Sequence, residues 1–246
     1  MEISLKSEVI KVILGFPITN SLILSLSSAF IIIVGSFLIV RSLKLIPSKI
    51  QNGFEIIVEA ILDFMSQTLG DRELAKKFFP VVAAIFLFIL LNNWLGVLPG
   101  TGSIGLNETH NGKEVFVPFF RSANSDLNTT IALALIAMAA VQIYGIKKFG
   151  FSGYFSKFIT LKKGPIYFFV GILELISELS KIISFSFRLF GNIFAGEVLL
   201  LIVMNLAPLF APFPFVILEF FVGFIQALVF AMLTMMFLKV ATETAH

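Results

Sequence analysis

Five ionisable side chains interrupt a long apolar stretch in the C-terminal third of the chain. They are Glu174, Glu178, Lys181, Arg188 and Glu197. A charge costs several kcal/mol at the centre of a bilayer, so ionisable residues at that depth are functional candidates by default. A carboxylate can take up and release a proton, whereas a guanidinium keeps its charge permanently. These residue types point to the attraction or movement of ions.

Helical geometry places the polar and small residues of this stretch on one face. At about 100° per residue, positions three and four apart share a face. The residues with this spacing are Glu174, Ser177, Lys181, Ser184, Arg188, Gly191 and Ala195. Small residues let another helix approach closely, so we expect Arg188 to lie in a shallow groove. Glu197 falls about half a turn around the helix from Arg188, so its side chain should face a different surface.

A second apolar stretch near the C-terminus carries an acid, a glycine and an amide on one helical face. These are Glu219, Gly223 and Gln226. Glu219 could relay a proton, and the Gln226 amide could accept a hydrogen bond from a guanidinium on a neighbouring helix. Both interpretations require that the two stretches form antiparallel neighbouring helices.

The composition is that of a membrane protein. Hydrophobic residues make up 58% of the 246 residues, charged residues make up 13%, and the mean hydropathy is +1.00. This leaves too little polar surface for a soluble globule. The net charge of +3 is spread over the loops, which excludes a nucleic-acid footprint. Without cysteine there is no disulfide, thiolate metal ligand or cysteine nucleophile.

We therefore predict an all-α integral membrane protein that forms a single membrane domain over residues 1–246. A helix needs about 20 apolar residues to cross the hydrocarbon core. The expected segments are a tail at 1–20, spans at 21–40, 79–98 and 127–146, an interfacial amphipathic helix at 54–69, and tilted helices at 166–206 and 215–242. The interfacial helix is indicated by Glu55, Glu59 and Asp63 at four-residue spacing.

The apolar stretch at 166–206 is too long for an ordinary span. As one helix it would be about 60 Å long, twice the thickness of the hydrocarbon core. It could form two spans with a tight turn, or one steeply tilted helix that ends at Ala207 and Pro208. Because the stretch contains no internal proline, we favour a tilted helix that forms a hairpin with the helix at 215–242.

Lysine and arginine predict the orientation. They are concentrated after the first and third spans, which places those loops in the cytoplasm. The N-terminal tail and the loop at 99–126 are then outside, and the C-terminus is cytoplasmic. Asp126 falls at the outer end of the third span. The tail mixes acids with bases before its apolar run, so we expect no removable signal peptide.

Three motifs resemble one family. They are SFRLFGNIFAGE at Ser186 to Glu197, SANSDLNTTIALAL at Ser122 to Leu135, and FIQALVFAMLTMMFL near the C-terminus. In this order and spacing they resemble subunit a of F-type ATP synthases, over roughly residues 75–246. The first 50 residues carry little of the resemblance.

The resemblance implies a function. Subunit a is not an enzyme on its own, binds no cofactor, and forms two offset proton half-channels against the ring of c subunits, coupling proton flow to ring rotation and ATP synthesis. The implied partners are the c ring, the peripheral-stalk b subunits, the remaining synthase subunits and membrane lipid. A bacterial plasma membrane is the expected location. Whether the ion is H⁺ or Na⁺ stays open.

The resemblance also implies roles for individual residues. Arg188 would face the ring carboxylate, flanked by Asn192 and Gln226. The outside path would contain Asn124, Asp126, Asn128, Glu197 and Glu219, and the cytoplasmic path Glu174, Ser177, Ser180 and Ser184. Many family members have a histidine at the position of Glu219, so which acid relays the proton stays open.

Each assignment has a structural alternative. Arg188 could form a structural ion pair with Glu178 or with a facing acid, and Asp126 could be only the N-cap of the third span. Glu174 and Glu178 could be interfacial, and Lys181 could extend towards the membrane surface. An ion-coupled secondary transporter is the alternative function, although such proteins normally show an internal repeat and none is visible here. A purely structural anchor gives no reason for charges at membrane depth.

Overall fold

The computed structural model describes residues 7–13, 15–44, 47–98, 105–110, 113–155, 165–208 and 210–243. These residues form six α-helices and one 3₁₀ turn, η1. The helices are α1 (Asn20–Ser42), α2 (Lys49–Leu69), α3 (Arg72–Val97), α4 (Leu127–Phe155), α5 (Pro165–Leu206) and α6 (Pro212–Thr242), and η1 is Ala123–Ser125.

Five of the described helices are long and apolar enough to cross a membrane, namely α1, α3, α4, α5 and α6. The predicted all-α membrane class is therefore confirmed, and the chain is a multi-pass membrane protein. The sixth helix, α2, has Gln51, Met65 and Leu69 as its buried residues. Its acids Glu59 and Asp63 form ion pairs with Arg72 at the start of α3, so they lie on an exposed, charged face.

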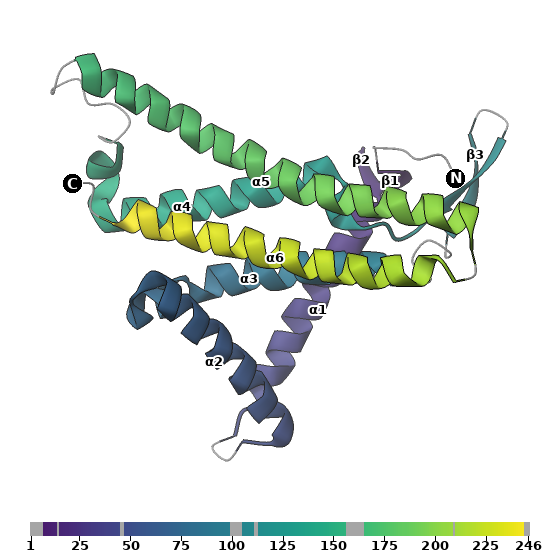
Figure 1. The fold of residues 1–246 in the computed structure, drawn as a ribbon, viewed down its shortest axis with the longest axis horizontal. Coiled ribbons are helices and arrows are strands. Elements are labelled where there is room, and N and C mark those ends of the chain that lie inside the picture. The colour runs from purple at the N-terminus through teal and green to yellow at the C-terminus, as the bar shows by residue number, and fades with distance from the viewer. Residues whose placement is uncertain are drawn as a thin grey trace.

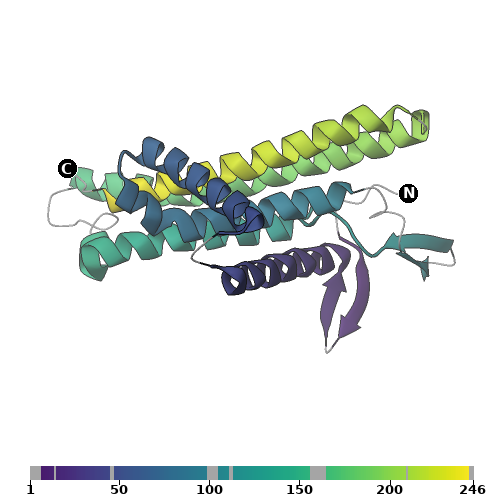
Figure 2. The ribbon, with the colours of Figure 1, turned by 90° about the horizontal axis from the view of Figure 1, so that it is seen from below.

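The helices α3, α4, α5 and α6 run lengthwise through the molecule, and α6 lies against α3 (Figure 1). Helix α1 packs against α3 on one side of this group (Figure 2), and α2 extends away from the group (Figure 1). One core cluster joins Ile89, Leu133, Leu189 and Phe230 of α3, α4, α5 and α6. A second cluster joins α2, α3, α4 and α6. Helix α6 contributes to both clusters and is central to the fold.

The long apolar stretch forms one continuous helix. Helix α5 contains 42 residues and ends at Leu206, and the chain then returns along α6 as the other arm of a hairpin (Figure 1). This decides between the two arrangements left open by the sequence. Helix α6 begins at Pro212 and includes Pro214 in its first turn, earlier than the expected start at 215. Proline is tolerated there because the first helical N–H groups have no intrahelical acceptor.

Two short hairpins were not predicted from the sequence. Strands β1 (Val9–Ile13) and β2 (Phe16–Thr19) pair in the N-terminal segment. Strands β3 (Gly105–His110) and β4 (Lys113–Pro118) pair in the segment between α3 and α4. The first hairpin turns at Gly15, whose φ of 84° is readily adopted only by glycine. Both hairpins lie towards the end of the molecule at which α4 begins (Figure 1).

Candidate functional site

Arg188 lies on a face of α5 that the described chain leaves open. Its side chain is exposed and has no ion pair or hydrogen bond within the described residues. A Cβ atom added at Gly191, one turn further along, would meet no atom within 4 Å. Ser177 and Ser184 are also exposed. The polar and small stripe seen in the sequence is therefore open from Ser184 to Ala195, whereas Glu174 and Lys181 of the same stripe are half-buried.

A neighbouring side of α5 is packed against the bundle. Phe185, Leu189 and Ile193 are buried in the cluster shared with α3, α4 and α6. Relative to Arg188 these three residues point about 60 to 140° away around the helix. The packing of one stripe thus fixes the direction in which the Arg188 stripe faces.

Glu178 does not pair with Arg188. Its carboxylate accepts a hydrogen bond of 3.0 Å from Gln142 of α4 and lies 2.7 Å from the Lys181 ammonium. Lys181 was expected to extend towards the membrane surface, but it forms this ion pair and lies 4.7 Å from the centroid of the Phe237 ring. Arg188 is therefore not held in the structural pair with Glu178 that the sequence left open.

Asp126 caps helix α4. Its carboxylate accepts a hydrogen bond of 2.9 Å from the Asn128 backbone N–H, as expected of an N-cap aspartate. The same carboxylate accepts hydrogen bonds from Ser7 at 2.6 Å and Ser21 at 3.0 Å. Asp126 therefore also ties the N-terminal segment and the start of α1 to the start of α4. Asn128 itself is exposed.

A chain of buried amides lies next to Asp126. Asn124 donates to Asn93 of α3 at 2.7 Å, and Asn93 donates to the Gly223 carbonyl of α6 at 2.8 Å. Asn124 Oδ1 is buried and has no hydrogen-bond partner among the described residues. Asn93 was not singled out in the sequence, although an amide pair at Asn92 and Asn93 in an apolar span was a visible signal.

Gly223 lets α3 and α6 approach closely. A Cβ atom at this position would lie 2.9 Å from Asn93 Cβ. We expect Gly223→Ala to lower the free energy of unfolding by about 1–3 kcal/mol, because neither backbone can move freely. Heating the detergent-solubilised complex and following the fraction that stays assembled measures this effect. Gly35→Ala is the control, since a Cβ there meets nothing within 4 Å, and equal melting of the two variants would contradict the expectation.

Glu219 and Glu197 come together where α5 and α6 meet. Glu219 is 7% exposed and lies over Gly196, where a Cβ would be 2.9 Å from its Oε1. Its Oε2 has no hydrogen-bond partner among the described atoms. The neighbouring Glu197 pairs with Arg121, with 3.0 Å between Nε and Oε1. Arg121 was not singled out in the sequence, and its role as the partner of Glu197 was missed.

The remaining candidates are separate from these clusters. Asn192 is exposed and Gln226 is half-buried, and within the described residues neither forms a hydrogen bond with Arg188. Glu174 is half-buried, and Ser180 is exposed with its hydroxyl bonded to the Ile176 carbonyl of its own helix. The structure thus brings together the acids near Gly196 and the amides near Asp126, but not the residues expected to flank Arg188.

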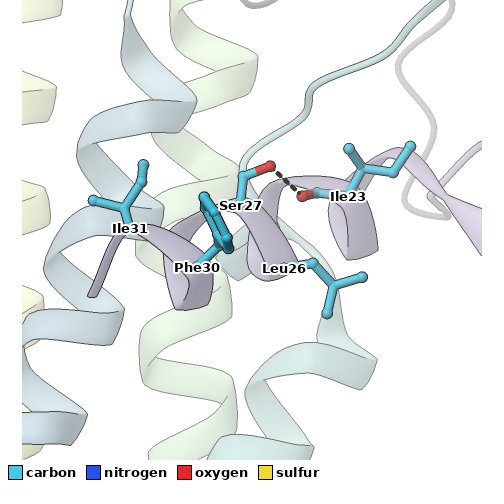
Figure 3. A pocket seen from close by; sticks show the side chains of 5 residues that line it. All are labelled: Ile23, Leu26, Ser27, Phe30 and Ile31. Carbon is cyan, nitrogen blue, oxygen red and sulfur yellow. Dashed lines mark hydrogen bonds between the residues drawn. The ribbon is translucent and has the colours of Figure 1, made fainter. Parts of the chain in front are cut away.

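Two grooves lie on the surface of the described chain, and their walls are mainly apolar. One of about 460 Å³ lies on α1, and Ser27 in its wall donates its hydroxyl to the Ile23 carbonyl of the same helix (Figure 3). A second, of about 540 Å³, lies between α1 and α2. No group of three His, Cys, Asp or Glu within the described residues could hold a metal ion. The candidate site residues therefore lie outside these two grooves, on α5, α6 and at the start of α4.

Comparison with known proteins identifies the family. The sequence profile described as ATP synthase A chain matches residues 22–239. A protein of Desulfotalea psychrophila named ATP synthase subunit a is 38% identical over 222 residues, which is 89% of this chain and 82% of the relative. This chain belongs to the ATP synthase A chain family. Relatives with the same name from Trichlorobacter lovleyi and Campylobacter jejuni are each 32% identical, over 92% and 89% of this chain and 89% and 88% of their own lengths.

The family match confirms the resemblance seen in the three sequence motifs and extends it. It begins at residue 22, so α1 also falls within the matched range, whereas the motifs covered only residues 75–246. All of the candidate residues fall within the matched range. The ATP synthase A chain family thus accounts for the whole membrane bundle of this chain, from α1 to nearly the end of α6.

Proposed function

We propose that this chain carries protons across the membrane as the stator subunit of an F-type ATP synthase. It is not an enzyme alone; it forms two offset half-channels against a ring of c subunits and so couples proton flow to ring rotation. The observation that carries the proposal is the exposed Arg188, which has no partner within the described chain and lies on an open face of α5.

The chemistry of the guanidinium suits this role. Arg188 is permanently charged, so it attracts a ring carboxylate only after that group has lost its proton. A protonated, neutral carboxylic acid can move away into lipid. Each charge that crosses 100 mV releases about 2.3 kcal/mol, so several protons are required for each ATP. Because the guanidinium separates the two half-channels, a proton must travel with the ring to pass between them.

The outside half-channel is formed by polar residues near the start of α4 and the meeting point of α5 and α6. We assign to it Asn124, Asp126, Asn128, Glu197 and Glu219. The unpartnered Oε2 of Glu219 and Oδ1 of Asn124 support this assignment, because buried polar atoms without a protein partner normally bind water. Water at these atoms would provide hydrogen-bonded steps for a proton.

The cytoplasmic half-channel uses the open stripe of α5. We assign to it Glu174, Ser177, Ser180 and Ser184, which lead along the helix towards Arg188. Exposure of the three serines supports this assignment. Asn192 and Gln226 flank Arg188 and bond to its guanidinium or to the ring carboxylate once the ring is in place.

Assembly and location follow from the same proposal. The partners are the c ring, the peripheral-stalk b subunits and the remaining synthase subunits, in a bacterial plasma membrane. The N-terminus is outside and the C-terminus is cytoplasmic, as the lysine and arginine distribution favours. Affinity purification of the tagged chain from native membranes tests this. We expect it to retain a ring of small two-helix subunits and a soluble ATPase head, and its isolation without them would contradict the proposal.

A further inference from the structure

A polar network joins α4, α5 and α6 two turns before Arg188. The Tyr154 hydroxyl donates to Gln142 Oε1 at 2.6 Å, and Gln142 Nε2 donates to Glu178 at 3.0 Å. Glu178 pairs with Lys181 at 2.7 Å, and Lys181 lies over the ring of Phe237 in α6. These contacts define the α4–α5–α6 network. None of its members carries a role in the proposed half-channels.

Tyr154 is held in place by its own helix. Helix α4 turns at Gly150, where φ is 75°, and the Tyr154 ring then packs against Gly145, where a Cβ atom would overlap it. Burial, together with the charges of Glu178 and Glu174, raises the pKa of Tyr154 to about 12. The phenol therefore stays protonated and donates to Gln142 throughout the physiological pH range.

The network lies where α5 leaves the bundle. Figure 1 shows the N-terminal part of α5 separating from α4 and α6. The apolar side chains there, such as Phe169 and Leu173, are exposed. By contrast, Glu178 and Lys181 are only 14% and 21% exposed. The charged pair is therefore among the first contacts that hold α5 as it joins the bundle.

The same pair fixes the rotation of α5 about its axis. Glu178 points about 80° away from Arg188 around the helix, in line with the packed Phe185 and Leu189, whereas Lys181 points about 20° away. Gln142 of α4 donates a hydrogen bond to Glu178, and the ring of Phe237 in α6 covers Lys181. A turn of α5 in either direction would break one of these contacts and would redirect Arg188.

We propose that Glu178 and Lys181 are positioning residues, which set the rotation of α5 so that Arg188 and the serine stripe face the ring. Neither residue carries the transported proton. The inference rests on the proposed function, since it assigns the network a task in presenting Arg188.

The test uses vesicles that contain the assembled membrane sector without its soluble head. We expect Glu178→Gln to lower proton conductance per complex about ten-fold or more, since small misplacements of a reacting group have effects of this size. The Lys181 ammonium then has no carboxylate partner. It moves towards water and rotates α5 with it. Gln142→Leu should act similarly, because it breaks the link to α4. Asn205→Leu is the control, since the hydrogen bond that this amide forms within the described chain goes to the Leu201 carbonyl of α5 itself.

A neutral pair should restore conductance. In Glu178→Gln combined with Lys181→Met, the two amides at 142 and 178 can still bond, and the methionine sulfur can contact the Phe237 ring. We expect conductance within about two-fold of the parent, because the effects of substitutions at two contacting residues do not simply add. If the double variant stays as low as Glu178→Gln, Glu178 itself carries protons and the positioning role is wrong. Parental conductance in Glu178→Gln and Gln142→Leu would also overturn it.

Helix rotation can be followed directly because the chain has no cysteine. Ile182 packs against the core, whereas the adjacent Ile183 is 60% exposed, so cysteines at these positions form a matched pair of reporters. A small membrane-permeant thiol reagent should label Ile183→Cys faster in the parent, and Glu178→Gln should reduce this difference. An unchanged labelling ratio would contradict the inference. If parental vesicles do not conduct, the proposed function fails instead, while the labelling ratio still tests the network.

Discussion

Replacement of Arg188 by alanine should abolish proton-driven ATP synthesis while the complex still assembles. The side chain is exposed and makes no ion pair or hydrogen bond within the described chain, so its loss removes a charge without disturbing the packing of the bundle. The measurement is the rate of ATP synthesis per assembled complex after a proton gradient is imposed on vesicles. We expect the rate to fall to that of vesicles without the membrane sector.

Two further substitutions sharpen this prediction. Arg188→Lys keeps the charge but loses the planar fork that engages both oxygens of a carboxylate, so we expect most of the synthesis to be lost. Arg41→Ala is the control, because Arg41 is an exposed arginine at the end of α1 that lies over the ring of Phe37, and it should retain the parental rate. Near-parental synthesis by assembled Arg188→Ala complexes would contradict the assignment of Arg188.

Replacement of Glu219 by glutamine should strongly reduce proton flow and leave assembly intact. Glutamine keeps the size and hydrogen bonding of the side chain over Gly196 but removes the group that can release a proton. The measurement is passive proton conductance through vesicles from which the soluble head has been removed, over a range of pH. The ATPase activity of the detached head should remain normal.

Histidine at the same position gives a second readout. Imidazole titrates near neutrality and can pass a proton between neighbours, so Glu219→His should partly restore the conductance lost in Glu219→Gln. Glu73→Gln is the control, because Glu73 is exposed and its ion pair in the described chain is with Lys76 of its own helix. If Glu219→Gln conducts like the parent at every pH, Glu219 is a buried structural acid and the outside path runs through Asp126 and Glu197.

The helical framework could be predicted because hydropathy and proline placement act locally. The absence of proline from 166 to 206 pointed to one long helix, and α5 is continuous over this range. The hairpins could not be predicted in the same way. Strands β3 and β4 contain six residues each, and over so short a run, alternation of polar and apolar residues is weak evidence against an irregular loop.

The candidate site was predictable only where it depends on spacing within one helix. The open stripe around Arg188 follows from helical periodicity, which needs only the sequence spacing. The pairing of Glu197 with Arg121 joins residues 76 positions apart, and the bond from Gln142 to Glu178 joins residues 36 positions apart. Such contacts depend on how the helices pack and on where a loop returns. Spacing along a single helix carries no information about them.

Proton uptake by liposomes that contain the purified chain, with and without the c ring, shows directly whether this chain can move protons alone. A stator subunit provides only the two half-channels, so a proton must ride on a ring carboxylate to pass between them. We expect liposomes with the chain alone to be no more permeable to protons than empty ones, and liposomes with chain and ring together to conduct. Proton transport by the chain alone would contradict the account and favour an independent ion-coupled transporter.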